Sequence, residues 1–251
     1  MPIKRAYRIK LGYTNGELLK KHFSGTDILE INWNKIELYN SRIKEIFHEL
    51  NAIVHESIKY EDLSSFDSKI DNAYKLMKNN DLIPKLNNNG RAREEVYYNW
   101  MRGYAICEFF FKALSIVFNV SQSSIKRIGK DNLTNIEKWS KSSTADLEIK
   151  LKNKIIRLEI QSGFKGKNDI KEQKVLEAKK LSSKDISSYI VHFDLYNGNA
   201  AIVNISEISD SNINWEHRQQ FENKKVFSIP SEAFNWILTD APPNYTEISI
   251  H

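Results

Sequence analysis

The stretch that decides the fold reads ADLEIKLKNKIIRLEIQSG and occupies positions 145–163. Apolar and polar residues alternate over 146–151 and again over 155–161, and a polar turn at 152–154 separates the two runs. Alternation with a period of two is typical of a strand with one buried face. The stretch therefore predicts an antiparallel β-hairpin.

The hairpin is expected to bring two acidic side chains together. With a turn near residue 153, residues whose numbers sum to about 305 or 306 should face each other, and Asp146 and Glu159 sum to 305. Like charges opposed on a sheet are destabilising unless a positive group lies between them. Mg²⁺ is such a group, because it binds one or two carboxylates together with waters and phosphate oxygens. We therefore expect a Mg²⁺ site at Asp146 and Glu159, with the backbone carbonyl of Ile160 as a further ligand. The alternative is a plain solvated hairpin, in which charges such as those of Glu148 and Lys150 simply face water.

The segments after the hairpin alternate between helix and strand. A lysine-rich helix is expected from about residue 168 to 181, followed by a strand over 188–196. Asn197-Gly198 favours a second hairpin, with 200–205 as the partner strand. One more strand is expected over 226–229. A last helix is expected to begin at Pro230, with Ser231 as its N-cap and Phe234 and Trp236 buried.

The segments before the hairpin are mainly helical. Apolar residues recur every three or four positions over 33–60, 67–79 and 94–118, which is the pattern of helices with a buried stripe. A turn-rich stretch at 83–90 separates residues 1–90, mainly helical, from the core at 91–251. We expect both parts to form one compact unit of the α/β class with an α-helical N-terminal extension.

Composition excludes several classes of protein. The chain has 251 residues, of which 41% are hydrophobic and 27% charged, values that fit neither a disordered nor a membrane protein. Its net charge of +5 permits a polyanionic partner without requiring one. The single cysteine, Cys107, excludes an intrachain disulfide, and its place among phenylalanines indicates packing rather than catalysis. We expect a cytoplasmic protein without membrane association.

The hairpin residues resemble the PD-(D/E)XK nuclease superfamily, and within it the type II restriction endonucleases. That family carries an acidic residue at the start of one hairpin strand and a (D/E)-x-K element on the next, followed by a helix and another strand. Ala145-Asp146 is similar to the first element and Glu159-Ile160-Gln161 to the second. The resemblance covers roughly residues 95–205. It implies a mixed central sheet flanked by helices, with Mg²⁺ as the cofactor.

Two positions depart from the family pattern. Ala145 stands in place of the proline, and Gln161 stands in place of the lysine. Glutamine does not exchange a proton near neutral pH, so the group that activates the attacking water is left open. In one interpretation the metal lowers the pKa of the water and Gln161 orients it. In the other, Lys165 or Lys167 in the following loop supplies the positive charge.

A further family element lies on the helix before the hairpin. Arg102-Gly103, followed by Glu108, resembles an Arg-Gly…Glu element, which implies that Glu108 supports the metal site. The alternative is an intrahelical ion pair between Glu108 and Lys112, four residues on.

The resemblance also implies DNA contacts. Phosphate contacts dominate DNA affinity, and the lysines after the hairpin are suited to them: Lys165, Lys167, Lys171 and Lys174. Base contacts are expected from a polar cluster within 212–220, because such side chains can reach base edges in the major groove; its members include Asn214, His217, Arg218 and Gln219. The loop at 87–91 is a second candidate for base contacts.

The resemblance therefore implies a type II restriction endonuclease that cleaves double-stranded DNA at a specific short sequence by Mg²⁺-dependent hydrolysis, leaving 5′-phosphate and 3′-hydroxyl ends. Asp146, Glu159, Gln161 and Glu108 would form its catalytic set. A two-fold homodimer is expected, formed by the N-terminal helices. The alternatives are another nuclease of the superfamily, acting in repair or without sequence specificity, and a non-catalytic DNA-binding protein in which the carboxylate pair is structural.

Overall fold

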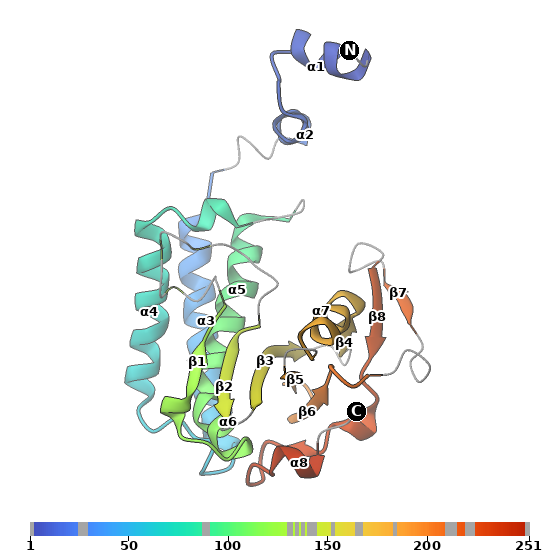
Figure 1. Ribbon diagram of the computed structural model, residues 1–251. Helices are drawn as coiled ribbons and strands as arrows, with labels where there is room; N and C mark the ends of the chain where they lie inside the picture. Colours follow the sequence, from blue (N-terminus) through green and yellow to red (C-terminus); the bar gives the residue numbers. More distant parts are fainter. Residues whose placement is uncertain are drawn as a thin grey trace.

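A mixed sheet forms the centre of the molecule (Figure 1). The computed structural model describes residues 3–24, 30–86, 91–129, 133, 136, 139, 145–151, 154–163, 168–182, 185–208, 215–218 and 224–248. Within these residues the strand order is β1-β2-β3-β5-β6-β9, with β3 and β5 parallel and the other neighbours antiparallel. The bounds are Ile125–Arg127 (β1), Leu147–Leu151 (β2), Lys154–Gly163 (β3), Ile186–Asp194 (β5), Asn199–Asn204 (β6) and Trp236–Ile237 (β9). The predicted mixed sheet flanked by helices is confirmed.

Both predicted hairpins are present. In β2 and β3 every paired position sums to 305, from Leu147 opposite Leu158 to Leu151 opposite Lys154. The register prediction is therefore confirmed. In the second hairpin, β5 pairs with β6 through a turn in which Gly198 has φ of 73°. That left-handed conformation is readily available to glycine, which explains the Asn-Gly signal in the sequence.

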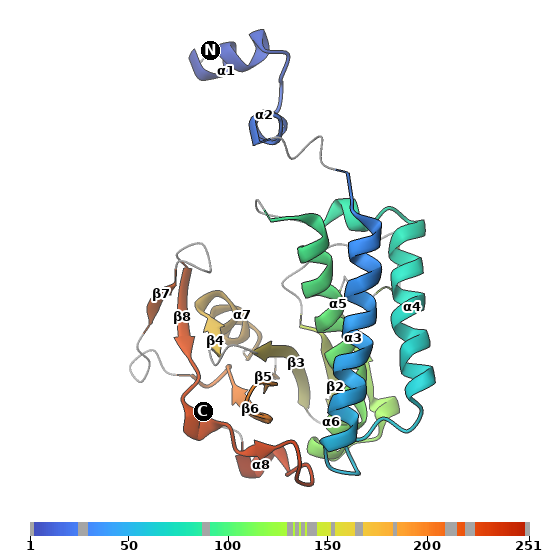
Figure 2. The same cartoon turned by 180° about the vertical axis from the view of Figure 1, so that it is seen from behind.

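A layer of helices covers one face of the sheet. It consists of α3 (Trp33–Ile53), α4 (Leu63–Asn79), α5 (Arg93–Phe109) and α6 (Phe111–Val117). Figures 1 and 2 show α3, α4 and α5 side by side, on the opposite side of the sheet from α7. Buried side chains from these helices and from the sheet form one hydrophobic cluster, which joins residues before and after position 90.

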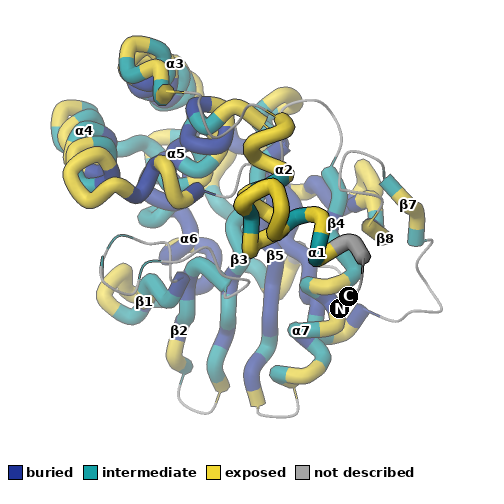
Figure 3. The backbone as a smooth tube through the Cα atoms, turned by 90° about the horizontal axis from the view of Figure 1, so that it is seen from above, coloured by how far each residue is buried: buried dark blue, intermediate teal, exposed yellow. Residues whose placement is uncertain are grey.

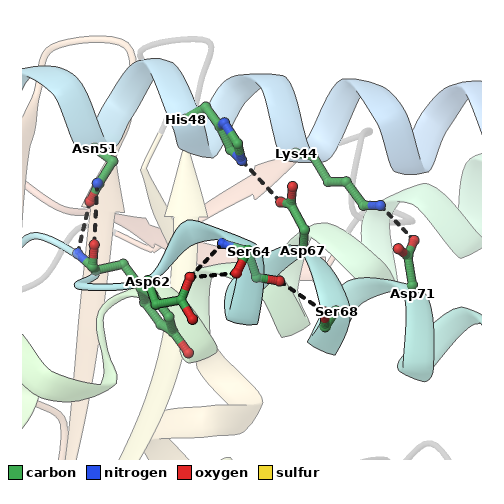
Figure 4. A network of polar contacts seen from close by, with 9 residues as sticks. Lys44, His48, Asn51, Asp62, Ser64, Asp67, Ser68 and Asp71 are labelled. Atoms are coloured by element: carbon green, nitrogen blue, oxygen red, sulfur yellow. Dashed lines mark hydrogen bonds and ion pairs between the residues drawn. The ribbon is translucent and has the colours of Figure 1, made fainter.

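Polar contacts fix α3 against α4 at the solvent side of this layer (Figure 4). Lys44 Nζ donates to Asp71 Oδ1 at 2.6 Å, and His48 Nε2 lies 3.0 Å from Asp67 Oδ1. The N-cap of α4 is Asp62, whose carboxylate accepts from the backbone N–H of Ser64 at 2.9 Å. The helix predicted at 67–79 is present and begins four residues earlier, at Leu63, directly after this N-cap.

The predicted helices at 33–60 and 94–118 are shorter in the structure. The first ends at Ile53, because Val54 has extended backbone, yet Ile58 beyond it is still fully buried. The second is interrupted at Phe110, which separates α5 from α6. Phe110 itself is fully buried, and its ring stacks on that of Phe193 at 4.0 Å between centroids.

The other face of the sheet carries a smaller layer. It contains α7 (Glu172–Ser182) and a three-stranded antiparallel sheet in the order β4-β8-β7, with bounds Asp169–Lys171 (β4), Lys224–Ser228 (β8) and Glu216–Arg218 (β7). The lysine-rich helix was predicted from about residue 168, but residues 169–171 instead pair with β8. A second hydrophobic cluster lies between this layer and the strands. Seen from above, β5 runs through the molecule as a mostly buried strand (Figure 3).

The prediction of a final helix from residue 230 is wrong. Ser231–Ala233 form only a 3-10 turn, and β9 follows, with Trp236 opposite Ala200 of β6. Phe234, Trp236 and Leu238 are buried while Ile237 is exposed. That alternation has the period of a strand, and pairing with the edge of the sheet prevails over the Pro-Ser start signal. The last helix, α8, is Tyr245–Ile248.

Two short helices precede the body of the fold. They are α1 (Ile3–Lys10) and α2 (Gly16–Ser24), and in Figures 1 and 2 both stand away from the rest of the chain. No described residue of α2 is buried. Among the helices that the structure describes, none has the length and apolar character needed to cross a membrane.

Candidate active site

Asp146 and Glu159 lie at neighbouring positions of the hairpin and line the same cavity. Asp146 immediately precedes β2, and its backbone N–H donates to the carbonyl of Leu158 at 3.0 Å. Its Oδ2 accepts from the backbone N–H of Ile160 at 2.7 Å, so the carboxylate turns toward β3. Asp146, Glu159 and Ile160 all line a cavity of about 480 Å³. The structure therefore brings together the three residues expected to bind a metal.

One face of α5 forms another wall of this cavity. Trp100, Gly103, Tyr104 and Cys107 recur on that face at steps of one helical turn. The rings of Trp100 and Tyr104 are stacked, with centroids 5.7 Å apart and planes 15° from parallel. Burial raises the pKa of the Cys107 thiol to about 12. The thiol is therefore not a nucleophile at neutral pH, in agreement with the packing role expected for it.

Three arginines also line the cavity: Arg91, Arg102 and Arg127. Arg127, on β1, donates from Nη1 to Cys107 Sγ at 3.3 Å. Burial lowers the pKa of the Arg102 guanidinium, but arginine stays charged at any physiological pH. Guanidinium groups suit phosphate because their planar N–H donors match its oxygens. The cavity thus combines two carboxylates with three cationic groups, an arrangement that can hold a phosphodiester next to a cation bound by the carboxylates.

Glu159 has a close cationic partner within the chain. Lys174, in the first turn of α7, places its Nζ 2.9 Å from Oε1 and 3.0 Å from Oε2 of Glu159. Both side chains are mostly buried, with 20% of Lys174 and 18% of Glu159 exposed. Glu159 and Lys174 also line a second cavity, of about 300 Å³, beside Ala145. Lys174 is one of the lysines expected to contact DNA phosphates, and in the structure its ammonium group contacts Glu159.

Gln161, which shares a face of β3 with Glu159, belongs to a partly buried polar network. Its amide oxygen Oε1 lies 3.4 Å from His192 Nδ1, and His192 Nε2 lies 2.8 Å from Asn168 Oδ1. Asn168 Nδ2 donates to Asp194 Oδ2 at 3.0 Å. Burial lowers the pKa of His192 to about 4, so its ring is neutral at physiological pH. Although Asp194 is buried, hydrogen bonds from Asn168 and Asn197 keep its pKa below the ordinary value.

Glu108 does not line the cavity that holds Asp146 and Glu159. Its Oε1 lies 2.7 Å from Arg127 Nη2 and its Oε2 lies 3.0 Å from Lys69 Nζ. Lys112, the alternative partner, pairs with Glu61 at 2.6 Å. The alternative, a Glu108–Lys112 ion pair, is therefore wrong, and the helix is interrupted at Phe110 between the two residues. Glu108 reaches the site through Arg127, which lines both the site and the pocket around Glu108, and through Tyr104, which also lines the site and is hydrogen-bonded to Glu108.

Three residues predicted to contact DNA, Lys171, His217 and Arg218, lie on the small sheet β4-β8-β7. Lys171 ends β4, and His217 is exposed on β7. Arg218 is held by acidic neighbours, with Nη2 2.9 Å from Glu216 Oε2 and Nε 3.5 Å from Asp169 Oδ2. Four residues lie outside the described part of the chain: Lys165, Lys167, Asn214 and Gln219.

The donor set suits a magnesium-like ion better than a transition metal. Among the described residues, no group of three or more His, Cys, Asp or Glu side chains is placed to hold a metal. Mg²⁺ does not need such a group, because it typically takes one or two protein carboxylates and fills its other positions with waters and substrate phosphates. Two carboxylates on one cavity, with arginines to hold a phosphate, fit this requirement.

Sequence reasoning missed Arg127 and the Lys174–Glu159 contact. Arg127 stands on a three-residue edge strand with no motif around it, so no signal marked it. Lys174 was recognised as one of several lysines, but its contact with Glu159 depends on how α7 packs on the sheet.

Comparison with known proteins gives little further evidence. No protein-family model matches the chain, and no curated protein matches it. Among solved structures, the chain is similar to a Holliday junction resolvase from the archaeal hyperthermophile Archaeoglobus fulgidus. The TM-score is 0.32 and the sequence identity 8%, over 52% of this chain and 93% of the resolvase chain. A similarity at this level carries no argument about function, which must come from the chain's own residues.

Proposed function

We propose that the protein is a Mg²⁺-dependent endonuclease of the type II restriction class, which cleaves double-stranded DNA at a specific short sequence. The observation that carries this proposal is the placement of Asp146 and Glu159 on one cavity that is also lined by Arg91, Arg102 and Arg127. Opposed carboxylates are destabilising by themselves, so their juxtaposition beside three guanidinium groups favours a site that binds a divalent cation and a phosphate.

The residues of the site have separate roles in this proposal. Asp146, Glu159 and the carbonyl of Ile160 would hold Mg²⁺. The bound ion would polarise the phosphodiester and lower the pKa of a water molecule. The three arginines would hold the phosphate, and Gln161 would orient the water by hydrogen bonding. Glu108 would act on the site indirectly, by holding the Arg127 guanidinium from the opposite side at 2.7 Å.

The reaction is hydrolysis of one phosphodiester bond. The water gives up a proton as its oxygen bonds to phosphorus, and the bond from phosphorus to the 3′-oxygen breaks. The 3′-oxygen takes up a proton and leaves as a hydroxyl group, and the 5′-phosphate keeps the water oxygen. The cavity residues contribute by fixing the phosphate in line with the attacking oxygen, because orientation alone lowers the barrier substantially.

The remaining DNA contacts stay predictions. Lys165, Lys167 and Lys171 are proposed to contact phosphates near the cleaved bond. His217 is exposed and is proposed, with Asn214 and Gln219, to contact bases. We do not retain Arg218 among the base contacts, because Glu216 and Asp169 already hold its guanidinium.

A homodimer is proposed for symmetric cleavage, with α1 and α2 against a second copy of the chain. Large apolar side chains of this region are exposed: Tyr7, Ile9, Leu11, Leu18 and Phe23. Sedimentation equilibrium of the full chain should give a dimer, and the double variant Leu18→Ser, Phe23→Ser should be a monomer. A monomeric full chain would contradict this part of the proposal.

A second candidate function is supported by one observation. Lys174 already compensates the charge of Glu159, so the carboxylate pair does not require a metal to be stable. The protein would then be a non-catalytic DNA-binding protein.

A cleavage assay separates the two candidates. Plasmid DNA is incubated with the protein and Mg²⁺, and then with EDTA. Asp146→Asn and Glu159→Gln should lower the cleavage rate on the order of a hundredfold or more. The matched control is Glu148→Gln, because Glu148 lies on the same hairpin but pairs with Arg157 instead.

The cleavage products identify the function. Discrete fragments indicate a restriction endonuclease, and a smear indicates a nonspecific nuclease. DNA binding without cleavage under any divalent cation favours the second candidate. Equal activity of the Asp146, Glu159 and Glu148 variants would exclude this cavity as the active site.

A further inference from the structure

Gln161, which stands where the motif has its lysine, belongs to a hydrogen-bonded network. Gln161 contacts His192, which contacts Asn168, which in turn donates to Asp194. Gly163, two residues on, belongs to the same arrangement, because a Cβ at that position would overlap Asn168 Oδ1. The network therefore fixes the end of β3 against β5 and against residue 168.

The direction of the hydrogen bonds fixes the Gln161 amide. Asn168 uses its N–H on Asp194, so its Oδ1 must accept from His192 Nε2. The neutral ring of His192 then has an acceptor at Nδ1, and the Gln161 amide satisfies it when its N–H, in place of the Oε1 that lies 3.4 Å away, is turned toward the ring. Gln161 is thus a neutral, oriented group, and it supplies no charge to the cavity.

The positive charge beside Glu159 comes from α7 and not from β3. Lys174 reaches Glu159 from α7 and contacts both carboxylate oxygens within 3.0 Å. The lysine expected two residues after Glu159 on the same strand face would occupy the same side of the sheet as α7. An ammonium group therefore lies beside Glu159, the second acidic residue of the motif. It belongs to Lys174 of α7, thirteen residues after position 161.

We propose that Lys174 supplies, from α7, the electrostatic function that the replaced lysine of the motif would have, and that Gln161 contributes no charge to it. This inference rests on the proposed nuclease function. In the hydrolysis described above, the Lys174 ammonium would stabilise the negative charge that develops on the phosphate oxygens as the bond to water forms. A fixed positive group acts strongly there because the side chain is mostly shielded from water.

Four proteins test this inference: wild type, Lys174→Gln, Lys174→Arg and the control Lys180→Gln. Lys180 lies on the same helix and lines the same second cavity, but it is exposed. Lys174→Gln should lower kcat for DNA cleavage on the order of a hundredfold. Lys174→Arg keeps the charge and should retain activity within about tenfold of wild type. Lys180→Gln should cleave like wild type.

A second measurement distinguishes this function from a merely structural one. Mn²⁺ binding is measured by calorimetry on wild type and Lys174→Gln without DNA. Removing the ammonium removes a cation that competes for Glu159, so Lys174→Gln should bind Mn²⁺ at least as tightly as wild type. Weaker Mn²⁺ binding together with lost cleavage would show that Lys174 only holds Glu159 in place, and would overturn the inference.

The failure of this inference differs from failure of the nuclease proposal. If wild type cleaves and Lys174→Gln cleaves equally well, Lys174 has no such function while the nuclease proposal stands. If wild type cleaves no DNA with any divalent cation, the nuclease proposal fails and the function assigned to Lys174 fails with it.

Discussion

Glutamine in place of Glu108 separates a structural ion pair from a catalytic one. The Glu108 carboxylate is 7% exposed and contacts Arg127, which is 23% exposed, at 2.7 Å. Glu108→Gln keeps the shape of the side chain and removes its charge, so a mostly buried guanidinium loses its ionic partner. Breaking a fully buried pair costs about 3–5 kcal/mol. In the variant, Arg127 remains partly exposed to solvent and still contacts the Cys107 sulfur and the face of the Phe111 ring. We therefore expect the free energy of unfolding to fall by about 2–3 kcal/mol. The exposed Lys69 contributes little.

Thermal unfolding measures this loss. For a chain of this size, each kcal/mol lowers the midpoint by about 2–4 °C, so Glu108→Gln should melt about 4–12 °C below wild type. The control is Glu61→Gln, because Glu61 is 82% exposed although its pair with Lys112 is equally short. Its midpoint should not change measurably. A Glu108→Gln midpoint equal to that of wild type would refute this reasoning. Normal stability with abolished cleavage would instead place Glu108 at the metal, as the family resemblance implied.

Three further predictions concern the buried network and the thiol. Burial lowers the pKa of His192 from 6.5 to about 4, so between these values only the unfolded chain binds the proton. The free energy of unfolding should therefore be highest above pH 6.5 and fall by about 3 kcal/mol toward pH 4. His192→Gln should remove this contribution in urea titrations at several pH values, and an unchanged slope would contradict the assignment. Gly163→Ala should lower stability by about 2–4 kcal/mol in the same assay, because its methyl group displaces Asn168 from His192; stability equal to wild type would show that the loop adapts. Cys107 should not react with a thiol reagent at neutral pH unless the protein unfolds, and fast reaction of the native protein would contradict its raised pKa of about 12.

The hairpin could be predicted from sequence because its determinants are local. The alternation over 146–161 identifies the strands, and a turn of known position fixes which residues oppose each other. The opposition of Asp146 and Glu159 follows from those two facts alone. The second hairpin was equally accessible, since Asn197-Gly198 marks its turn.

The rest of the site depends on contacts between distant elements. Arg127 comes from an edge strand 19 residues before Asp146, and Lys174 from a helix that crosses over the sheet. Neither position shows in a local pattern, because tertiary packing decides which charged residue of a helix or strand meets the carboxylates. The C-terminal segment shows the same limit. Its strand pairs with β6, and that pairing was hidden by the Pro-Ser signal for a helix start.

The most direct measurement is anomalous diffraction from a crystal of the protein soaked in Mn²⁺. The proposal predicts one anomalous peak or more in the cavity, within about 2–2.5 Å of carboxylate oxygens of both Asp146 and Glu159. The peak should vanish in Asp146→Asn. A crystal that binds Mn²⁺ only elsewhere, or that keeps Lys174 on Glu159 with no ion between the carboxylates at saturating Mn²⁺, would contradict the proposal.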